Sequence, residues 1–174
     1  IVIRGCVKLF KIAPNGRELI LRALSDGESF NEVPIFDEGT NPVSSAALEE
    51  SELLIIQSND LRKMIKNKPE LAGLIVVKLA HILRNMVGLV EEFAFFQVTN
   101  RLARLLFNLN ETDLVGNQEN RLTQDDLAAR LGTVREVVAR SLRELEQAGV
   151  IQVHRGEIKI LERVKLREWG KIHL

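Results

Sequence analysis

The sequence has little of what redox, metal-binding or membrane proteins usually require. Its 174 residues contain a single cysteine, Cys6, which excludes an internal disulfide framework and a multi-cysteine metal or cluster site. There is no unbroken run of about 18 apolar residues and no secretory signal, so we expect a cytoplasmic protein without a membrane span. No Ser-His-Asp, Cys-His or metal-spaced grouping is present, so we expect no catalytic residue and no metal ligand.

An excess of charge of either sign is also absent. Lys and Arg total 24, as do Asp and Glu, which gives a formal net charge of zero. This balance argues against a protein whose whole surface binds nucleic acid, but it permits a local basic face. The apolar content of 45% and charged content of 28% are typical of folded soluble proteins with one large or two small domains.

Residues 122–149 do contain a strong pattern, that of two short helices joined by a tight turn. Thr123 is placed to cap the first helix, and Gly132 is placed to end it. Thr133 and Glu136 have the spacing of a capping box, which predicts the start of the second helix. The alternative is a surface helical hairpin with ordinary solvated charges.

The second helix carries a polar face whose residue types suit the DNA major groove. Arginine can donate two hydrogen bonds to guanine, and glutamate can accept one from cytosine. On the opposite side we expect Val138, Leu142 and Leu145 to point into the core. The charged residues of the polar face are Arg135, Glu136, Arg140 and Arg143.

A predicted hairpin follows these helices. Residues 150–153 and 157–161 have the pattern of strands, and 154–156 form the turn between them. Two helices followed by a hairpin make a winged helix, whose basic, glycine-containing tip could lie along phosphates. DNA binding is therefore the function that this region predicts.

The first 60 residues are predicted to be all-β. Short apolar-rich runs alternate with turn signals, and this spacing suits a barrel, a roll or a sandwich. Because the chain opens directly on a strand, we expect the first strands of this domain to be missing. The predicted strands are 1–3, 6–12, 17–24 and 53–57.

A long helix is predicted to begin near Pro69, after a short helix at 58–66. A heptad seam favours dimerisation through this helix. The alternative is a helix that is buried within a single, monomeric chain. The seam consists of Ile75, Leu79, Ile82, Met86, Leu89, Phe93 and Phe96. A second apolar flank, expected to pack on the β-rich part, consists of Leu74, Val77, Leu83, Val87 and Val90. Near 97–100 the seam ends at a predicted hinge, where Thr99 could cap a new helix.

This order of elements resembles the regulators of the CRP/FNR family, and three segments carry the resemblance. Residues 30–39 resemble the family's nucleotide-phosphate cassette, 93–101 its hinge, and 131–140 its recognition helix. The resemblance implies an α+β fold with a partial cyclic-nucleotide-binding β-roll, a long dimerisation helix and a C-terminal winged helix-turn-helix. The implied domains are an effector-sensing β-roll, a dimerisation helix with hinge, and a DNA-binding domain, at 1–68, 69–98 and 99–174.

The resemblance also implies roles for individual residues and a set of partners. Base reading carries over onto Arg135, Glu136 and Arg140. Candidate phosphate contacts are Thr123, Thr133, Arg143, His154 and Arg155. The implied partners are a second copy of the chain and double-stranded DNA with inverted half-sites similar to TGTGA, with RNA polymerase as a further candidate.

The implied effector site departs from the family pattern. Glu32 stands where the family's ribose-binding glutamate falls, but Asn31 replaces the preceding glycine. The expected Arg-Ser pair is replaced by a segment that ends in Ser44 and Ser45, and no Arg or Lys occurs between positions 22 and 62. The adenine-facing hydroxyl residues fall at the apolar Met86 and Val87. Because a buried phosphate needs a cationic partner, we expect an effector other than cyclic AMP.

Other cofactors find little support in the sequence. An iron–sulfur cluster requires several cysteine thiolates, and haem requires an axial ligand, for which His81 is the only interior-looking histidine. The effector therefore stays unidentified. The competing function is a sensor module of the same fold that acts through protein partners without specific DNA readout.

Overall fold

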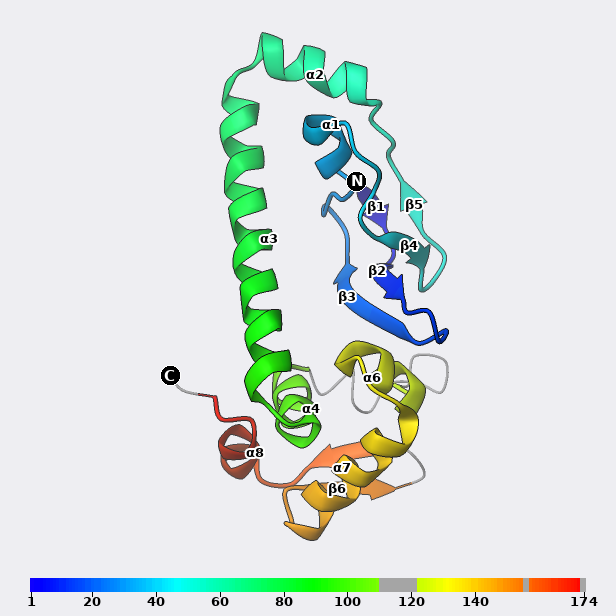
Figure 1. The fold of residues 1–174 in the computed structure, drawn as a ribbon, viewed down its shortest axis with the longest axis vertical. Helices are drawn as coiled ribbons and strands as arrows, with labels where there is room; N and C mark the ends of the chain where they lie inside the picture. The colour runs from blue at the N-terminus through cyan, green and yellow to red at the C-terminus, as the bar shows by residue number, and fades with distance from the viewer. Residues whose placement is uncertain (110–121, 155–156, 173–174) are drawn as a thin grey trace. The chain divides into compact units, whose positions relative to one another are not determined.

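The computed structural model describes residues 1–109, 122–154 and 157–172 (Figure 1). It divides into two compact units, one made of Ile1–Lys11 with Ile20–Val90 and the other of Ile12–Leu19 with Glu91–Leu174. Small sheets, one long helix and a helical C-terminal part confirm the α+β class predicted from the sequence.

The strands at the N-terminal end form two small sheets. β1 (Val2–Arg4) pairs antiparallel with β5 (Glu52–Leu53). In the other sheet β2 (Val7–Ile12) lies between β3 (Glu18–Leu24) and β4 (Ser44–Ala47). Their small core consists of the buried Val2, Val7 and Leu24, with Leu9 and Phe30 packed against it.

Two details of this region differ from the sequence prediction. The strand expected at 53–57 ends at Leu53. Leu54 still exchanges backbone hydrogen bonds with Ile1, but it lies beyond the β1–β5 register, and both Leu54 and Ile55 are exposed. β4 was not predicted, because its sequence Ser-Ser-Ala-Ala lacks a large apolar residue and is recognised only through its pairing with β2.

Three helices complete the first unit and its connection to the second. They are α1 (Val33–Asp37), α2 (Ser58–Asn67) and α3 (Glu70–Phe95). The predicted short helix and the predicted long helix are therefore confirmed as α2 and α3. By length and composition α3 could also cross a membrane, as many helices of soluble proteins could. Lys78, His81 and Arg84 interrupt the apolar residues of α3, so its sequence contains no unbroken apolar run.

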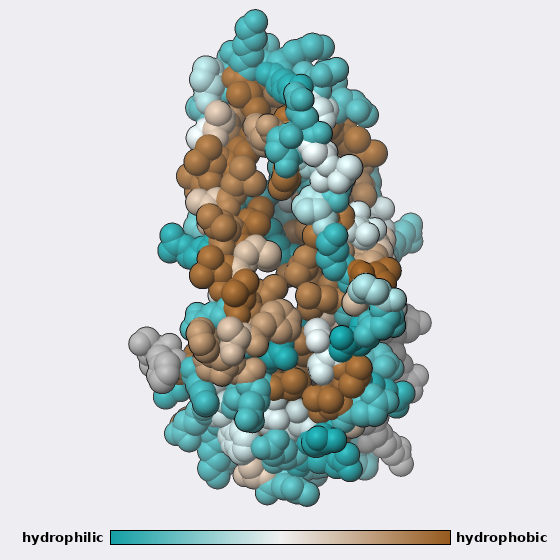
Figure 2. Space-filling model, in the orientation of Figure 1, coloured by the Kyte–Doolittle hydropathy of each residue, from teal (hydrophilic) through white to brown (hydrophobic). Residues whose placement is uncertain are grey.

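The two apolar flanks of α3 differ in exposure. The heptad-seam residues Ile75, Leu79, Ile82, Met86 and Leu89 are half-buried within the chain. The second flank, expected to be the inward one, is exposed, and that prediction is wrong. Its exposed residues include Leu74, Val77, Leu83, Val87 and Val90, and Figure 2 shows apolar side chains at the surface along this helix. The heptad repeat of α3 does not reveal which flank faces inward, because this depends on the contacts of the helix with the rest of the chain.

The second unit is built around one core of leucine, isoleucine and valine. Leu102 and Leu106 of the first helix pack with Leu127 of the second and Leu145 of the third. Its elements are α4 (Val98–Asn108), α6 (Gln124–Leu131), α7 (Arg135–Gln147), β6 (Ile151–His154), β7 (Glu157–Ile160) and α8 (Arg163–Trp169). This order of helices followed by an antiparallel hairpin confirms the predicted winged helix-turn-helix.

The helix ends agree only partly with the predicted caps. Thr123 caps α6 in a reciprocal capping box with Asp126, and Gly132 ends α6 in the left-handed conformation at φ 60°, as predicted. Thr133 does not cap α7, because the N-cap residue is Val134 and no side chain bonds the helix start. Thr99 is likewise not a cap. It lies inside α4, whose capping box uses Gln97 and Asn100.

Candidate DNA interface and sensor pocket

Helix α7 has one buried and one exposed side. Val138, Leu142 and Leu145 are buried, which confirms the core positions predicted for them. Arg135, Glu136, Arg140 and Arg143 are all exposed. The helix therefore presents a charged stripe to solvent while its apolar stripe anchors it in the unit.

The charges of this stripe are only weakly engaged within the unit. Arg135 is 63% exposed, and its guanidinium lies 3.7 Å from the carboxylate of Asp125, which is 71% exposed. The Nε of Arg143 donates to the carbonyl oxygen of Ala139. Ion pairs this exposed contribute little free energy, so the arginines can exchange these contacts for contacts with a ligand at small cost.

A buried polar contact fixes α7 against α4. The hydroxyl of Thr99 lies 2.9 Å from the hydroxyl of Ser141 and donates a hydrogen bond to the carboxylate of Glu144 at 2.8 Å. On the hairpin side, the carboxylate of Glu146 accepts from the backbone N–H of Val153 at 2.8 Å. These bonds hold the orientation of the exposed stripe. The contacts of Thr99 join residues more than 40 positions apart, which no local sequence pattern reveals.

Two arginines of α4 hold the end of α3. The guanidinium of Arg101 lies 4.5 Å from the ring centroid of Phe93, and that of Arg104 lies 4.5 Å from the ring centroid of Phe96. Arg104 also pairs with Glu92 at 3.4 Å. Phe93 and Phe96 were predicted to extend the dimer seam. Here each ring contacts a guanidinium of the chain itself, although Phe93 is still 41% exposed, and Phe96 follows the last residue of α3.

The expected phosphate contacts lie in different surroundings. The hydroxyl of Thr123 is engaged with the carboxylate of Asp126, so a phosphate near it would also meet a negative charge. Thr133 is half-buried and its N–H donates to Ala128. His154 is exposed at the end of β6, where it stands opposite Glu157 in the antiparallel register of β6 and β7. Arg155 lies outside the described residues.

The expected effector cassette at 30–39 contains α1, and Asn31 and Glu32 directly precede that helix. Asn31 adopts the left-handed conformation with φ 66°, which explains why asparagine, a residue that tolerates this region, can stand in the place of a glycine. Glu32, which precedes α1, has a side chain that is only 12% exposed. Ser44 and Ser45 lie exposed on β4, while Met86 is half-buried and Val87 is exposed on α3.

The carboxylate of Glu32 is occupied by groups of the protein itself. It pairs with the ammonium of Lys78 on α3 and accepts a hydrogen bond from the hydroxyl of Ser29 at 2.6 Å. Burial raises the pKa of Glu32, but the hydrogen bonds from Lys78 and Ser29 outweigh this effect and leave the pKa below its ordinary value. Sequence reasoning missed Lys78, although a lysine within an otherwise apolar helix flank was a signal for it.

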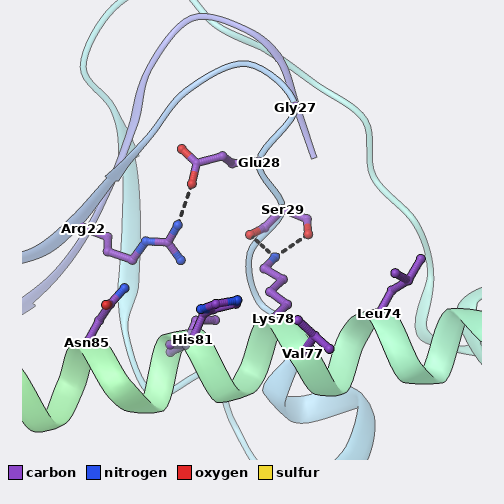
Figure 3. A pocket seen from close by; sticks show the side chains of 10 residues that line it. Arg22, Gly27, Glu28, Ser29, Leu74, Val77, Lys78, His81 and Asn85 are labelled. Carbon is purple, nitrogen blue, oxygen red and sulfur yellow. Dashed lines mark hydrogen bonds and ion pairs between the residues drawn. The ribbon is translucent and has the colours of Figure 1, made fainter.

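A cavity of about 360 Å³ lies beside this ion pair in the first unit (Figure 3). None of the residues expected in the effector pocket lines it. Its lining residues come from β3, from the segment that follows β3 and from α3. Within the described residues, no group of three or more His, Cys, Asp or Glu side chains could hold a metal ion.

Comparisons with known protein families agree with this architecture. The family model described as a cyclic nucleotide-binding domain matches residues 1–68, and that of a Crp-like helix-turn-helix domain matches residues 100–169. The cyclic AMP receptor protein of Thermus thermophilus is 32% identical to the chain over 168 residues, which cover 97% of the chain and 77% of that relative.

Two solved structures have the same fold over nearly the whole chain. A transcriptional regulator of the crp/fnr family from Eubacterium rectale gives a TM-score of 0.81 at 25% identity, over 99% of this chain and 80% of that one. The c-di-GMP responsive global regulator CLP of Xanthomonas campestris gives a TM-score of 0.76 at 25% identity, over 91% of this chain and 82% of that one.

Proposed function

Because the chain belongs to the CRP/FNR-type transcription regulators, we propose that it is a homodimeric, sequence-specific DNA-binding regulator gated by a small effector other than cyclic AMP. One observation carries the DNA-binding part of this proposal. Arg135, Glu136 and Arg140 are exposed on α7, whose opposite side is anchored in the core. We place such a regulator in the cytoplasm, with access to DNA and to RNA polymerase.

The proposed base readout follows from the chemistry of these three residues. Glu136 and Arg140 are one helical turn apart on the same face, and Arg135 lies at the edge of that face. Arg135 and Arg140 would each donate two hydrogen bonds to a guanine, and Glu136 would accept one from a cytosine. The exposed, weakly paired state of Arg135 supports this role, because little free energy is lost when it leaves Asp125.

Phosphate contacts would set the register of the protein on DNA without reading its sequence. Arg143 is the strongest candidate, since it is exposed on the same helix as the reading residues. Thr133 and His154 flank α7 and the hairpin and suit the same role. Thr123 is a weaker candidate because of its bond to Asp126, and Arg155 stays a proposal from the sequence.

Dimerisation through α3 is part of the proposal, but we assign it to the exposed flank. Val76, Leu83, Val87 and Val90 are each more than half exposed, although they are apolar. With Ala80 and Ala94 they recur at alternating steps of four and three, the repeat of a coiled-coil seam. The seam predicted from the sequence is half-buried within the chain, and this leaves it less surface to offer a partner.

The contacts of Glu32 support an effector other than cyclic AMP. Lys78 and Ser29 already satisfy the carboxylate that would meet the ribose. The segment after Gly39 has no cation for a phosphate, and Met86 and Val87 offer no hydroxyl group to adenine. Relatives named for cyclic AMP and a structural neighbour described as c-di-GMP responsive differ in effector, so family membership leaves it open.

We propose three functional parts: an effector-sensing domain at 1–68, a dimerisation helix with hinge at 69–98, and a DNA-binding domain at 99–174. The ranges of the two family models support the first and the third. The end of α3 at Phe95 and the start of α4 at Val98 support a hinge between them.

Selection of binding sites from random double-stranded DNA by the full chain tests the DNA-binding proposal. We expect an inverted repeat with half-sites similar to TGTGA, bound by two copies of the chain. Recovery of no preferred sequence at several salt concentrations would contradict specific readout. That outcome would favour a sensor module that acts through protein partners.

A further inference from the structure

The cavity in the first unit brings together polar groups from two elements that are distant in the sequence. Arg22 belongs to β3, whereas Lys78, His81 and Asn85 project from one side of α3 toward the segment that carries Glu28 (Figure 3). A molecule bound here would contact the sheet and the long helix at once. The complete lining consists of Arg22, Gly27, Glu28, Ser29, Leu74, Val77, Lys78, His81, Ile82 and Asn85.

The carboxylate of Glu28 and the oxygen atoms of Ser29, which line this cavity, already accept hydrogen bonds within the chain. One carboxylate oxygen of Glu28 accepts from Arg22 at 2.5 Å, and the other accepts from the backbone N–H of Ser25 at 2.8 Å. Ser29 accepts from Lys78, which lines the cavity and also pairs with Glu32, a residue outside the lining. The charge of Lys78 is therefore balanced by Glu32, and neither carboxylate near the cavity is without a cationic partner.

Donor groups, in contrast, are in excess. Arg22 has five N–H donors, and within the described residues only one hydrogen bond, to Glu28, uses them. Neither His81 nor Asn85 has a hydrogen-bond partner within the described part of the chain, and both are exposed. A guanidinium fork, an imidazole N–H and an amide N–H₂ therefore line the same space, and together they suit an oxyanion.

The remaining walls of the cavity are apolar. Leu74 and Val77 are more than half exposed along α3. Ile82 adds a half-buried apolar surface close to the polar groups. The volume of about 360 Å³ lies at the lower end of the range for small-molecule pockets. A ligand for this site would combine one anionic group with a small apolar body.

We propose that this cavity binds a compact organic anion, a molecule with one phosphate or carboxylate group, through Arg22, His81 and Asn85. The inference deepens the proposed function, on which it rests, by naming the chemical class of the effector. It also separates the anion site from the phosphate cassette at 30–39, which lacks a cation. A bound anion would bridge β3 and α3, and α3 leads to the DNA-binding unit.

Ligand-observed NMR titration of the full chain tests this proposal with three aromatic probes. Benzoate and phenyl phosphate supply the two anion types, and benzamide supplies the same ring without a charge. We expect one or both anions to bind at least about tenfold more tightly than benzamide, because charge-assisted hydrogen bonds are stronger than neutral ones. The anion that binds identifies carboxylate or phosphate as the preferred group.

Variants then locate the site. Arg22→Met should weaken anion binding about tenfold or more, and Asn85→Ala, at an exposed position that should not affect folding, should weaken it severalfold. Arg22→Lys should restore only part of the affinity, because an ammonium lacks the planar fork. Lys63→Met, which removes an exposed cation of α2 outside the cavity, should leave the affinity unchanged.

Three outcomes would overturn the anion site. They are affinities for both benzoate and phenyl phosphate that do not exceed the affinity for benzamide, no binding of either anion up to about 10 mM, or unchanged affinity in both Arg22→Met and Asn85→Ala. Gel-shift assays with the selected DNA, run on the same preparations, measure DNA binding independently of anion binding. The proposed regulator and the proposed anion site are therefore tested separately. DNA binding without anion binding would overturn only the anion site, and anion binding without DNA binding would overturn only the regulator.

Discussion

Arg101 lies over the ring of Phe93 and also donates a hydrogen bond from Nη1 to the carbonyl oxygen of Leu131 at 2.8 Å. It thereby joins the last turns of α3 to the C-terminal end of α6. Burial lowers the pKa of Arg101, and the nearby Glu92 partly opposes this effect. The side chain thus gives up solvation to hold α6, the helix that precedes α7.

We expect Arg101→Ala to lower the free energy of unfolding by about 1–3 kcal/mol, the combined contribution of a charged hydrogen bond and a cation–π contact. Urea denaturation followed by circular dichroism would measure it. Arg143→Ala, at an exposed position of α7, is the matched control and should change stability by less than about 0.5 kcal/mol. Equal stabilities of the two variants would show that the Arg101 contacts do not support the fold.

The exposed flank of α3 leads to a prediction about assembly. Leu83→Glu with Val87→Glu places charges on two side chains that are 66% and 61% exposed in the single chain. If this flank is the dimer contact, association would bury unpaired like charges at a cost of several kcal/mol, and the variant should be a folded monomer. Analytical ultracentrifugation would report the change in mass.

The seam predicted from the sequence provides the comparison. Ile82→Glu with Leu89→Glu alters half-buried positions and should destabilise the first unit as well as any dimer. A folded monomer from this pair, together with an intact dimer from the Leu83 and Val87 pair, would return the dimer contact to the predicted seam.

The ion pair between Glu32 and Lys78 predicts a pH dependence of stability. Folding holds the pKa of Glu32 below its ordinary value of 4.5, so the pair stabilises the folded state above that value. The contribution should disappear as the pH falls through the lower, folded-state pKa. The difference in unfolding free energy between wild type and Glu32→Gln should therefore shrink between neutral and acidic pH.

Urea denaturation at a series of pH values would measure this difference. Glu38→Gln is the control, because its carboxylate is 83% exposed and lies 4.0 Å from its partner Arg62. The Glu38 variant should track the wild type at every pH. A Glu32→Gln difference that stays constant into acid would contradict the assigned role of the carboxylate.

Cyclic AMP should bind this chain weakly, because no cation follows Gly39 to neutralise its phosphate. Calorimetric titration should give no saturable heat at micromolar concentrations. Val43→Arg restores an arginine immediately before Ser44 and should raise the affinity, while Val43→Met, of similar length but without charge, should not. Micromolar binding by the wild type would contradict this prediction.

The residues predicted correctly from the sequence are those whose surroundings are local. Gly132 and the buried face of α7 follow from turn chemistry and helical periodicity, and both are found as expected. On α3 the same reasoning had two apolar flanks to choose from, and periodicity alone does not say which one faces the chain's own strands. The Lys78–Glu32 pair joins residues 46 positions apart, which no local pattern reveals.

The base-reading residues lead to the sharpest prediction. Arg140→Ala should weaken binding to the selected DNA about ten- to a hundredfold, since a bidentate contact with guanine is worth roughly 1–3 kcal/mol of discrimination. It should also relax the preference at one base position in a repeated selection from random DNA. The helix itself should persist, because Arg140 is exposed and the core contacts of α7 lie on its other side.

Arg143→Ala is the matched variant, one helical turn further along α7 and equally charged. As a phosphate contact it should weaken binding to all sequences alike and reduce the salt dependence by about one contact, with the selected motif unchanged. If Arg140→Ala instead returns the wild-type motif, the reading face has been assigned to the wrong residues. DNA binding by the family's fold would survive that result, because phosphate contacts do not depend on Arg140, but the readout by Arg135, Glu136 and Arg140 would not.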